Sequence, residues 1–318
     1  MSVNADKPHL WKADIAASVD SFNGWFIEFA PQTYRESRAT TTGQVREALL
    51  RLNDMRNLNP ATLKAYPAIL QTLRMSTAPP IARDRLIGLA SVPASLVHSL
   101  EDGILPPRLG TEKLDRNLAD ICEVITKLLD TDIFPWLAED DLPDDTDRDR
   151  AASIVADRLC GAVANPIVRN AQEQRQLAVI EQFLRRYGYR RMAHPPSKPI
   201  AEMEPGTFTF RMNVVVGSAK KVNIPIDVVI QPKNLVPGNF PILIEAKSAG
   251  DYTNTNKRRK EEATKLRQLR DAYGEGVQLI LFLNGYFDSG YLGYEAAEGL
   301  DWVWEHRMED LLQLGIDQ

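Results

Sequence analysis

The hydrophobic pattern of this 318-residue chain changes its period once, near Gly206. Before residue 190, apolar side chains recur at steps of three and four, the spacing of an amphipathic helix, as in Ile15, Val19, Phe22, Phe26 and Phe29. After Gly206, apolar residues alternate with polar or smaller ones, the spacing of a half-buried strand, as in Phe208, Phe210, Met212, Val214 and Val216. The chain is therefore predicted to join a helical part to a part that contains a sheet.

The C-terminal part continues this alternation of strands and helices. Two further strands are expected at 222–230 and 240–246, and a polar, basic helix at 254–273. A buried strand at 277–283 and a closing strand and helix near 302–314 complete the pattern. We predict an α/β (α+β) fold, with a helical region at 1–150 and a mixed-sheet core flanked by helices at 151–318.

Charge is unevenly distributed along the chain. The formal net charge of −5 does not favour a nucleic-acid partner, and acid is concentrated at 139–147. From 253 to 270, however, seven basic residues face only Glu261 and Glu262, so one concentrated basic stripe remains available. Composition alone leaves the question of nucleic-acid binding open.

Several classes of protein are disfavoured. The two cysteines form neither a disulfide framework nor a metal pattern, and no G-x-x-x-x-G-K-[ST] motif indicates a nucleotide cofactor. The N-terminal residues are polar, unlike a secretory signal, and apolar runs such as 279–283 are too short to cross a bilayer. We expect a cytoplasmic protein without a membrane partner.

Two acidic residues interrupt consecutive apolar strands. Asp227 lies within 224–230, and Glu245 and Lys247 lie within 242–247. Burying an unpaired carboxylate costs several kcal/mol, so each acid needs a cation or a wet strand end. Adjacent strands can bring Asp227 and Glu245 together, and Lys247 projects from the same strand face as Glu245.

This arrangement predicts a magnesium site for phosphoryl transfer. Oxygen ligands without His or Cys suit Mg²⁺ better than Zn²⁺, with Mn²⁺ as the expected substitute. Lys247 would stand beside the metal, where it could orient or help deprotonate a water molecule. The alternative is an edge-strand ion pair, which arises by chance in many α/β proteins. The basic helix that follows favours the catalytic interpretation, because it would put a phosphate-binding surface beside the metal.

Asp227 followed by Glu245-Ala246-Lys247 resembles the PD-(D/E)xK motif of the restriction-endonuclease-like fold. Pro225 stands one residue earlier than the motif's usual adjacent proline. Segments elsewhere resemble the XamI/SalI restriction endonucleases over most of the chain: Asn4–His9, Ser18–Asp20, Phe29–Pro31, Arg74–Met75, Thr77–Pro80, Asp84–Leu86 and Asn165–Glu173.

The resemblance implies a homodimeric type II restriction endonuclease of a restriction-modification system. Its substrate would be double-stranded DNA with the palindrome GTCGAC, cut to leave a 5′ overhang and 5′-phosphate ends. Asp227, Glu245 and the Ala246 carbonyl would be metal ligands, and Lys247 the water-orienting base or electrostatic partner. A further carboxylate often comes from the helix before the first core strand, where Glu173 and Glu181 are the candidates. For both residues, simple solvation of a helix face is an equal alternative.

The basic helix is predicted to contact DNA, because Arg and Lys bind guanine and phosphate and Asn binds adenine. The candidates are Asn254, Asn256, Lys257, Arg258, Arg259, Lys260 and Lys265. A solvated, charged helix face is the alternative here. For the region 1–150 we expect a role in dimerisation or in clasping DNA.

Two other functions remain open at the level of sequence. One is a repair or structure-selective nuclease on the same core. The other is a catalytically inactive DNA-binding module that keeps the fold. Discrete fragments from a digest would separate the first from a restriction enzyme, and binding without nicking would identify the second.

Overall fold

The computed structural model describes residues 2–107, 110–138, 142–195, 198–217, 221–234 and 240–316; the side chains of 254 and 256–259 lie outside this description. The chain forms two compact units, one of residues 1–29 with 169–318 and the other of residues 30–168. Both boundaries fall inside long helices, α1 (Pro8–Arg51) and α7 (Asp145–Arg186). The division differs from the one expected at residue 150, since the first 29 residues pack with the sheet.

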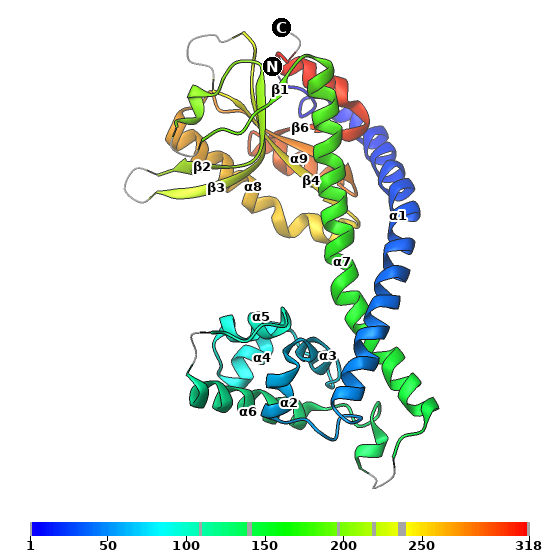
Figure 1. The fold of residues 1–318 in the computed structure, drawn as a ribbon. Helices are drawn as coiled ribbons and strands as arrows, with labels where there is room; N and C mark the ends of the chain where they lie inside the picture. The colour runs from blue at the N-terminus through cyan, green and yellow to red at the C-terminus, as the bar shows by residue number, and fades with distance from the viewer. Residues whose placement is uncertain are drawn as a thin grey trace. The chain divides into compact units, whose positions relative to one another are not determined.

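The larger unit is built on a six-stranded mixed sheet with the order β1-β2-β3-β4-β5-β6 (Figure 1). The strands β2 and β3 and the strands β3 and β4 pair antiparallel, and the other neighbours pair parallel. The strand bounds are β1 (Arg190–Arg191), β2 (Thr207–Val216), β3 (Val222–Gln231), β4 (Ile242–Ala249), β5 (Leu279–Gly285) and β6 (Asp301–Trp304). The mixed α/β fold predicted from the change of period is confirmed.

Helices cover both faces of this sheet, which is why β5 is buried along its whole length. Leu243 and Leu281 pack toward helix α8 (Tyr252–Tyr273) and helix α9 (Ser289–Ala297), in what we call the α8 core. Ile244 and Phe282 point the other way, toward α7 and the 3-10 run η4 (Glu305–Leu314), in the α7 core. The short 3-10 turn η3 (Ile200–Glu202) precedes β2. The closing helix expected near 302–314 is thus a 3-10 helix.

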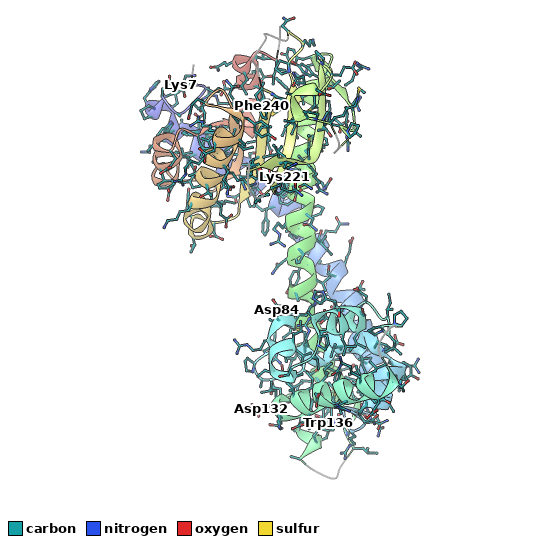
Figure 2. The ribbon with its side chains drawn as sticks, turned by 90° about the vertical axis from the view of Figure 1, so that its left-hand side faces the viewer. Lys7, Asp84, Asp132, Trp136, Lys221 and Phe240 are labelled. Carbon is teal, nitrogen blue, oxygen red and sulfur yellow. The ribbon has the colours of Figure 1, made fainter. Side chains whose placement is uncertain are left out.

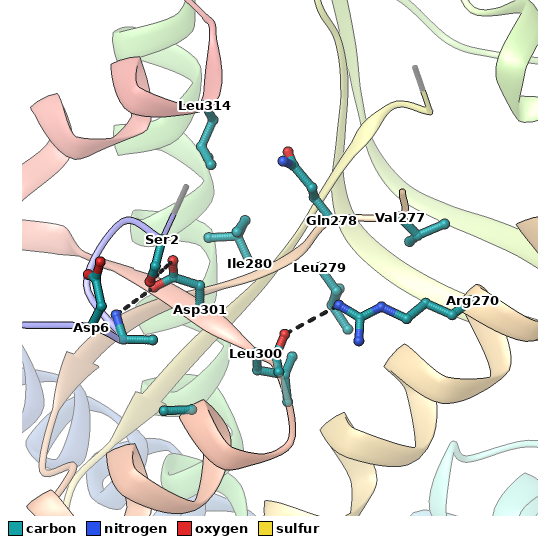
Figure 3. Close-up of a pocket in the computed structure, with 13 residues that line it drawn as sticks. Ser2, Asp6, Arg270, Val277, Gln278, Leu279, Ile280, Leu300, Asp301 and Leu314 are labelled. Atoms are coloured by element: carbon teal, nitrogen blue, oxygen red, sulfur yellow. Dashed lines mark hydrogen bonds between the residues drawn. The ribbon is translucent and has the colours of Figure 1, made fainter. Parts of the chain in front are cut away.

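The N-terminal segment is tied to the last strand. The carboxylate of Asp301 in β6 accepts the backbone N–H groups of Val3, Asn4 (2.9 Å) and Ala5 (3.0 Å). The Ser2 hydroxyl donates to the same carboxylate at 2.9 Å. Beside these contacts lies a cavity of about 410 Å³ that Asp301 also lines (Figure 3). These bonds explain why the first residues of the chain belong to the unit formed mainly by its C-terminal half.

The smaller unit is built from helices, and an isolated antiparallel bridge joins Thr77 and Leu129 among its described residues. Its elements besides the parts of α1 and α7 are α2 (Pro60–Ala65), η1 (Pro67–Ile69), α3 (Leu70–Met75), α4 (Arg83–Ala90), α5 (Ala94–Glu101), α6 (Thr111–Leu128) and η2 (Pro135–Leu137). They enclose a separate core that contains Leu73, Leu118 and Trp136, the last of which is labelled in Figure 2. Glu101, although buried, pairs with Arg74 at 2.5 Å. A close guanidinium partner offsets part of the cost of burying this carboxylate.

Candidate active site

Asp227 and Glu245 lie on the neighbouring antiparallel strands β3 and β4. Val228 pairs with Ile244, and the two acids are the next residues beyond that pair. The backbone N–H of Ala246 donates to Asp227 Oδ2 at 2.9 Å, which fixes the first carboxylate against the second strand. The structure therefore brings the two acidic residues of the sequence motif together.

Glu245 and Lys247 of β4 form a row of four alternating charges together with two residues of α8, Glu262 and Lys265. Glu245 Oε1 is 2.7 Å from Lys265 Nζ, and Glu245 Oε2 is 3.4 Å from Lys247 Nζ. Lys247 Nζ in turn is 2.6 Å from Glu262 Oε1. Glu245 and Glu262 are 3% and 1% exposed, so the two ammonium groups compensate carboxylates that are almost out of water.

The position of α8 explains why Glu262 and Lys265 reach the site. Residues three apart on a helix share a face, and Ala263, Leu266 and Leu269 anchor the neighbouring positions in the α8 core. Lys265 also donates to the Pro225 carbonyl at 3.2 Å, so it bridges the two strands that carry the acids. From the sequence, Lys265 is predicted to contact DNA, whereas Glu262 has no predicted role in the site.

The site perturbs the pKa of Asp227 strongly. Burial, together with the nearby Glu245 and Glu173 charges, raises this pKa to about 6, against the opposing effects of the Ala246 N–H and Lys247. For Lys247, burial lowers the pKa, but Glu245 and Glu262 outweigh it and the net shift is upward. Lys247 is therefore an ammonium at neutral pH. A cation that approaches Asp227 would stabilise the ionised form of its carboxyl group.

The two helix carboxylates proposed as additional ligands lie in different surroundings. Glu173 in α7 is near enough to raise the pKa of Asp227, and its Oε1 accepts from Arg211 at 2.7 Å. Glu181 instead pairs with Arg185 at 2.7 Å and with Arg191 at 3.2 Å. The structure thus brings Glu173 to the site, whereas Glu181 joins an ion-pair cluster on the surface of its helix.

Arg211 stands opposite Asp227 on the other side of β3, between the pairs Phe210–Val228 and Met212–Ile226. Its φ of 53° is in the left-handed region, which costs a non-glycine residue about 1 kcal/mol or more. Phe208 and Phe210 pack in the α7 core, whereas Met212, Val214 and Val216 pack in the α8 core. The buried side chains of β2 therefore change from one face of the sheet to the other at Arg211, beside the site.

Buried amides support the strand that carries Lys247. Gln176 in α7 donates to the carbonyls of Lys247 and Phe282, each at 3.4 Å, and Gln172 donates to Asn284 at 3.2 Å. All three amide side chains are at most 2% exposed. Gln172 and Gln176 look like ordinary helix-surface residues in the sequence, so no local pattern signals this network.

Gly285 at the end of β5 permits the close approach of the two strands. A Cβ there would meet the Ala249 carbonyl oxygen at 2.1 Å, and the φ of 103° also excludes most side chains. Its N–H donates to the Ser18 hydroxyl at 2.8 Å. The end of β4 that follows Lys247 is thereby packed closely against the end of β5, which Ser18 ties to α1.

The predicted DNA-contact stretch begins directly after β4, within α8. The side chains of Asn254, Asn256, Lys257, Arg258 and Arg259 lie outside the described residues. Lys260 is described and exposed. The helix itself runs from Tyr252 to Tyr273, close to the expected 254–273.

The oxygen donors fit a hard divalent cation of the Mg²⁺ type. Among the described residues, no three His, Cys, Asp or Glu side chains form a metal cluster by themselves. Mg²⁺, however, is usually held by one or two carboxylates together with water and substrate phosphates. Two adjacent acids, one with a pKa near 6, supply the protein's share of such a site.

A mixed sheet flanked by helices, with two acids and a lysine on adjacent strands, is consistent with a restriction-endonuclease-like core. The chain belongs to the XamI restriction endonuclease family, whose model matches residues 53–304. It is 56% identical over 313 residues to the type II restriction enzyme SalI of Streptomyces albus G, covering 98% of this chain and 99% of that protein. It is accordingly a type II restriction enzyme, a site-specific endonuclease that acts on double-stranded DNA.

One solved structure gives a weak match. Protein VC1899 from Vibrio cholerae aligns with a TM-score of 0.29 and 11% identity, over 88% of this chain and 56% of that one. The chain thus spans little more than half of that protein, and the likeness carries no argument about fold or function.

Proposed function

We propose that this restriction enzyme hydrolyses both strands of duplex DNA at a site formed by Asp227, Glu245 and Lys247. The observation that carries the proposal is the contact between the two acid-bearing strands, with Asp227 held by the Ala246 N–H and raised in pKa. Type II restriction enzymes generally use divalent metal ions. The proposed cofactor is Mg²⁺, with Mn²⁺ as a substitute, because the donors are hard oxygens.

Asp227, Glu245 and the Ala246 carbonyl would hold this ion, with Glu173 as a further candidate. When bound, it would neutralise charge on the phosphate and lower the pKa of the attacking water. Lys247, kept protonated by Glu245 and Glu262, would bind the scissile phosphate or orient the water as an ammonium. The charges around Lys247 favour this electrostatic role over the role of a general base.

The proposed substrate is the palindrome GTCGAC, cut by in-line attack of water to leave 5′-phosphate ends on a 5′ overhang. The resemblance to the XamI/SalI enzymes, with 56% identity to SalI, supports this choice. A palindrome is read most simply by a protein with twofold symmetry, so the proposed active form is a homodimer. The helical unit of residues 30–168 is proposed to dimerise or to clasp DNA.

A cytoplasmic location is expected of a restriction enzyme. Within the described chain, one helix, α7, is long and apolar enough to cross a membrane by length and composition only. Core helices of soluble proteins pass the same test, and 39% of its most apolar stretch is buried. This helix is weak evidence for a membrane, and its last turns pack on the sheet through Ile180 and Phe183.

A plasmid digest followed by sequencing of the ends tests the proposal. With Mg²⁺ we expect discrete fragments whose ends map to GTCGAC, and no cleavage in EDTA. A smear, or cuts that follow DNA structure, would favour a repair or structure-selective nuclease. DNA that is retarded on a gel but never nicked, with Mg²⁺ or Mn²⁺, would indicate an inactive binding module. Sedimentation of the enzyme with and without a cognate duplex would test the homodimer.

A further inference from the structure

The hairpin formed by β2 and β3 presents an exposed face that carries Asn213 and Asn223 and lies next along the strands from Asp227. Its register places Val215 opposite Asn223 and Asn213 opposite Pro225. Arg211 lines the same groove as Asn213 and Asn223, and it stands opposite Asp227 where the alternation of faces along β2 is broken. Arg211, Asn213, Val215, Asn223 and Pro225 are exposed, and Asp227 is half-buried. On the other face of the hairpin, Val214, Val216, Ile224 and Ile226 are buried.

This face forms one wall of a groove of about 600 Å³, and the segment around Lys198 forms another. The described lining residues that carry polar or charged side chains are His194, Lys198, Thr209, Arg211, Asn213, Lys221, Asn223 and Tyr273. Three of them are permanent cations, and none of the described lining residues is acidic. A groove of this composition is unusual on a chain whose net charge is −5.

Two of the three cations of this groove, Lys198 and Lys221, are available to a ligand. Within the described chain, neither Lys198 nor Lys221 has a carboxylate partner at ion-pair distance; Lys221 is labelled in Figure 2. Lys221 also lines a neighbouring cavity with Asp271, but no ion pair joins the two. Arg211, at the end nearest the site, pairs with Glu173 at 2.7 Å.

We propose that this groove binds the sugar-phosphate backbone of the DNA that leads away from the cleavage site. Lysine, arginine, asparagine and threonine side chains are the usual partners of phosphate oxygens, and free lysines provide the counterion-release term of affinity. A strand rises about 3.3 Å per residue, so Lys221 lies roughly 20 Å from Asp227 along β3. That distance corresponds to about six base pairs of duplex at 3.4 Å each. This inference rests on the proposed cleavage site at Asp227.

The test measures DNA binding by Lys198→Ala, Lys221→Ala and the double variant, with Ca²⁺ in place of Mg²⁺ to prevent cleavage. The slope of log affinity against log salt is negative, and its magnitude is expected to decrease by roughly 0.9 for each lysine that is removed. Affinity for a cognate duplex and for a duplex without GTCGAC should fall by the same factor, because a backbone contact carries no sequence information. Lys12→Ala, an exposed lysine of α1 outside the groove, is the matched control and should leave the slope unchanged.

Two results would overturn the inference. One is an unchanged salt slope in the double variant. The other is a loss confined to the cognate duplex, which would indicate base reading in place of backbone binding. Cleavage by the unaltered enzyme is measured in parallel, so that the two proposals fail separately. If the wild-type enzyme cuts DNA and the double variant binds normally, only the proposal about the groove is refuted. If the wild-type enzyme never cuts, the proposed function is refuted.

Discussion

Replacing Asp227 with asparagine should stabilise the metal-free enzyme at neutral pH while it abolishes cleavage. Asparagine keeps an oxygen that can accept from the Ala246 N–H but carries no charge to desolvate beside Glu245. The pKa of Asp227 rises from 3.8 to about 6 on folding, and at 1.36 kcal/mol per pKa unit the upper bound is about 3 kcal/mol.

Because Asp227 is only half-buried, solvent screening reduces this gain to about 1 to 2 kcal/mol. For a unit of this size, that gain corresponds to a rise of roughly 2 to 8 °C in Tm. Thermal unfolding in EDTA at pH 8 measures the difference directly.

The pH dependence of this difference has a definite sign. The folded protein binds the Asp227 proton more tightly than the unfolded chain does. Wild-type stability from this group is therefore highest below pH 3.8, declines as pH rises through about 6, and is flat above. The advantage of Asp227→Asn should be complete at pH 8 and shrink as pH falls below 6.

Divalent metal supplies the control. Mg²⁺ should raise the Tm of the wild-type protein by mass action and leave the variant nearly unchanged, which reduces or reverses the difference seen in EDTA. An Asp227→Asn protein with the same or a lower Tm in EDTA at pH 8 would refute the claim that a desolvated, like-charged carboxylate pair forms this site.

Three other changes test the surroundings of the site and the core. Glu262→Gln removes the buried partner of Lys247, so single-turnover cleavage should slow by roughly 10- to 100-fold while duplex binding in Ca²⁺ stays unchanged; parallel losses of both would contradict a positioning role. Lys265→Met leaves the buried Glu245 without its closest cation, so Tm in EDTA should fall and the increase on adding Mg²⁺ should exceed that of the wild type; equal increases would argue against it. Burial raises the pKa of Cys122 to about 11, so its thiol should resist Ellman's reagent at pH 8 until the protein unfolds, and rapid labelling of the native protein would contradict this packing.

The strands and the two acid-bearing segments could be predicted because their signals are local. Alternation identified β2, and the apolar runs around Asp227 and Glu245 identified β3 and β4. A carboxylate inside such a run is costly unless it is compensated, so the sequence itself pointed to these residues. Their adjacency followed from the short connection between two consecutive strands.

Other parts of the site depend on contacts between distant segments. Glu262 and Lys265 belong to a charge run that looks like a solvated helix face, and only the packing of α8 turns them toward β4. The tie between Asp301 and residues 2–5 spans nearly the whole chain. The left-handed backbone of Arg211 has no sequence signal, since arginine does not favour that conformation.

The most direct test of the proposed active site is a single comparison of the wild-type enzyme with Glu245→Gln on a duplex that contains GTCGAC. Binding in Ca²⁺ and cleavage in Mg²⁺ are followed on the same end-labelled DNA. We predict that Glu245→Gln retains the bound complex but cleaves at least about 10³-fold more slowly, as expected for the loss of a group that stabilises the transition state. Cleavage by Glu245→Gln at the wild-type rate would contradict the assignment of the active site to β3 and β4.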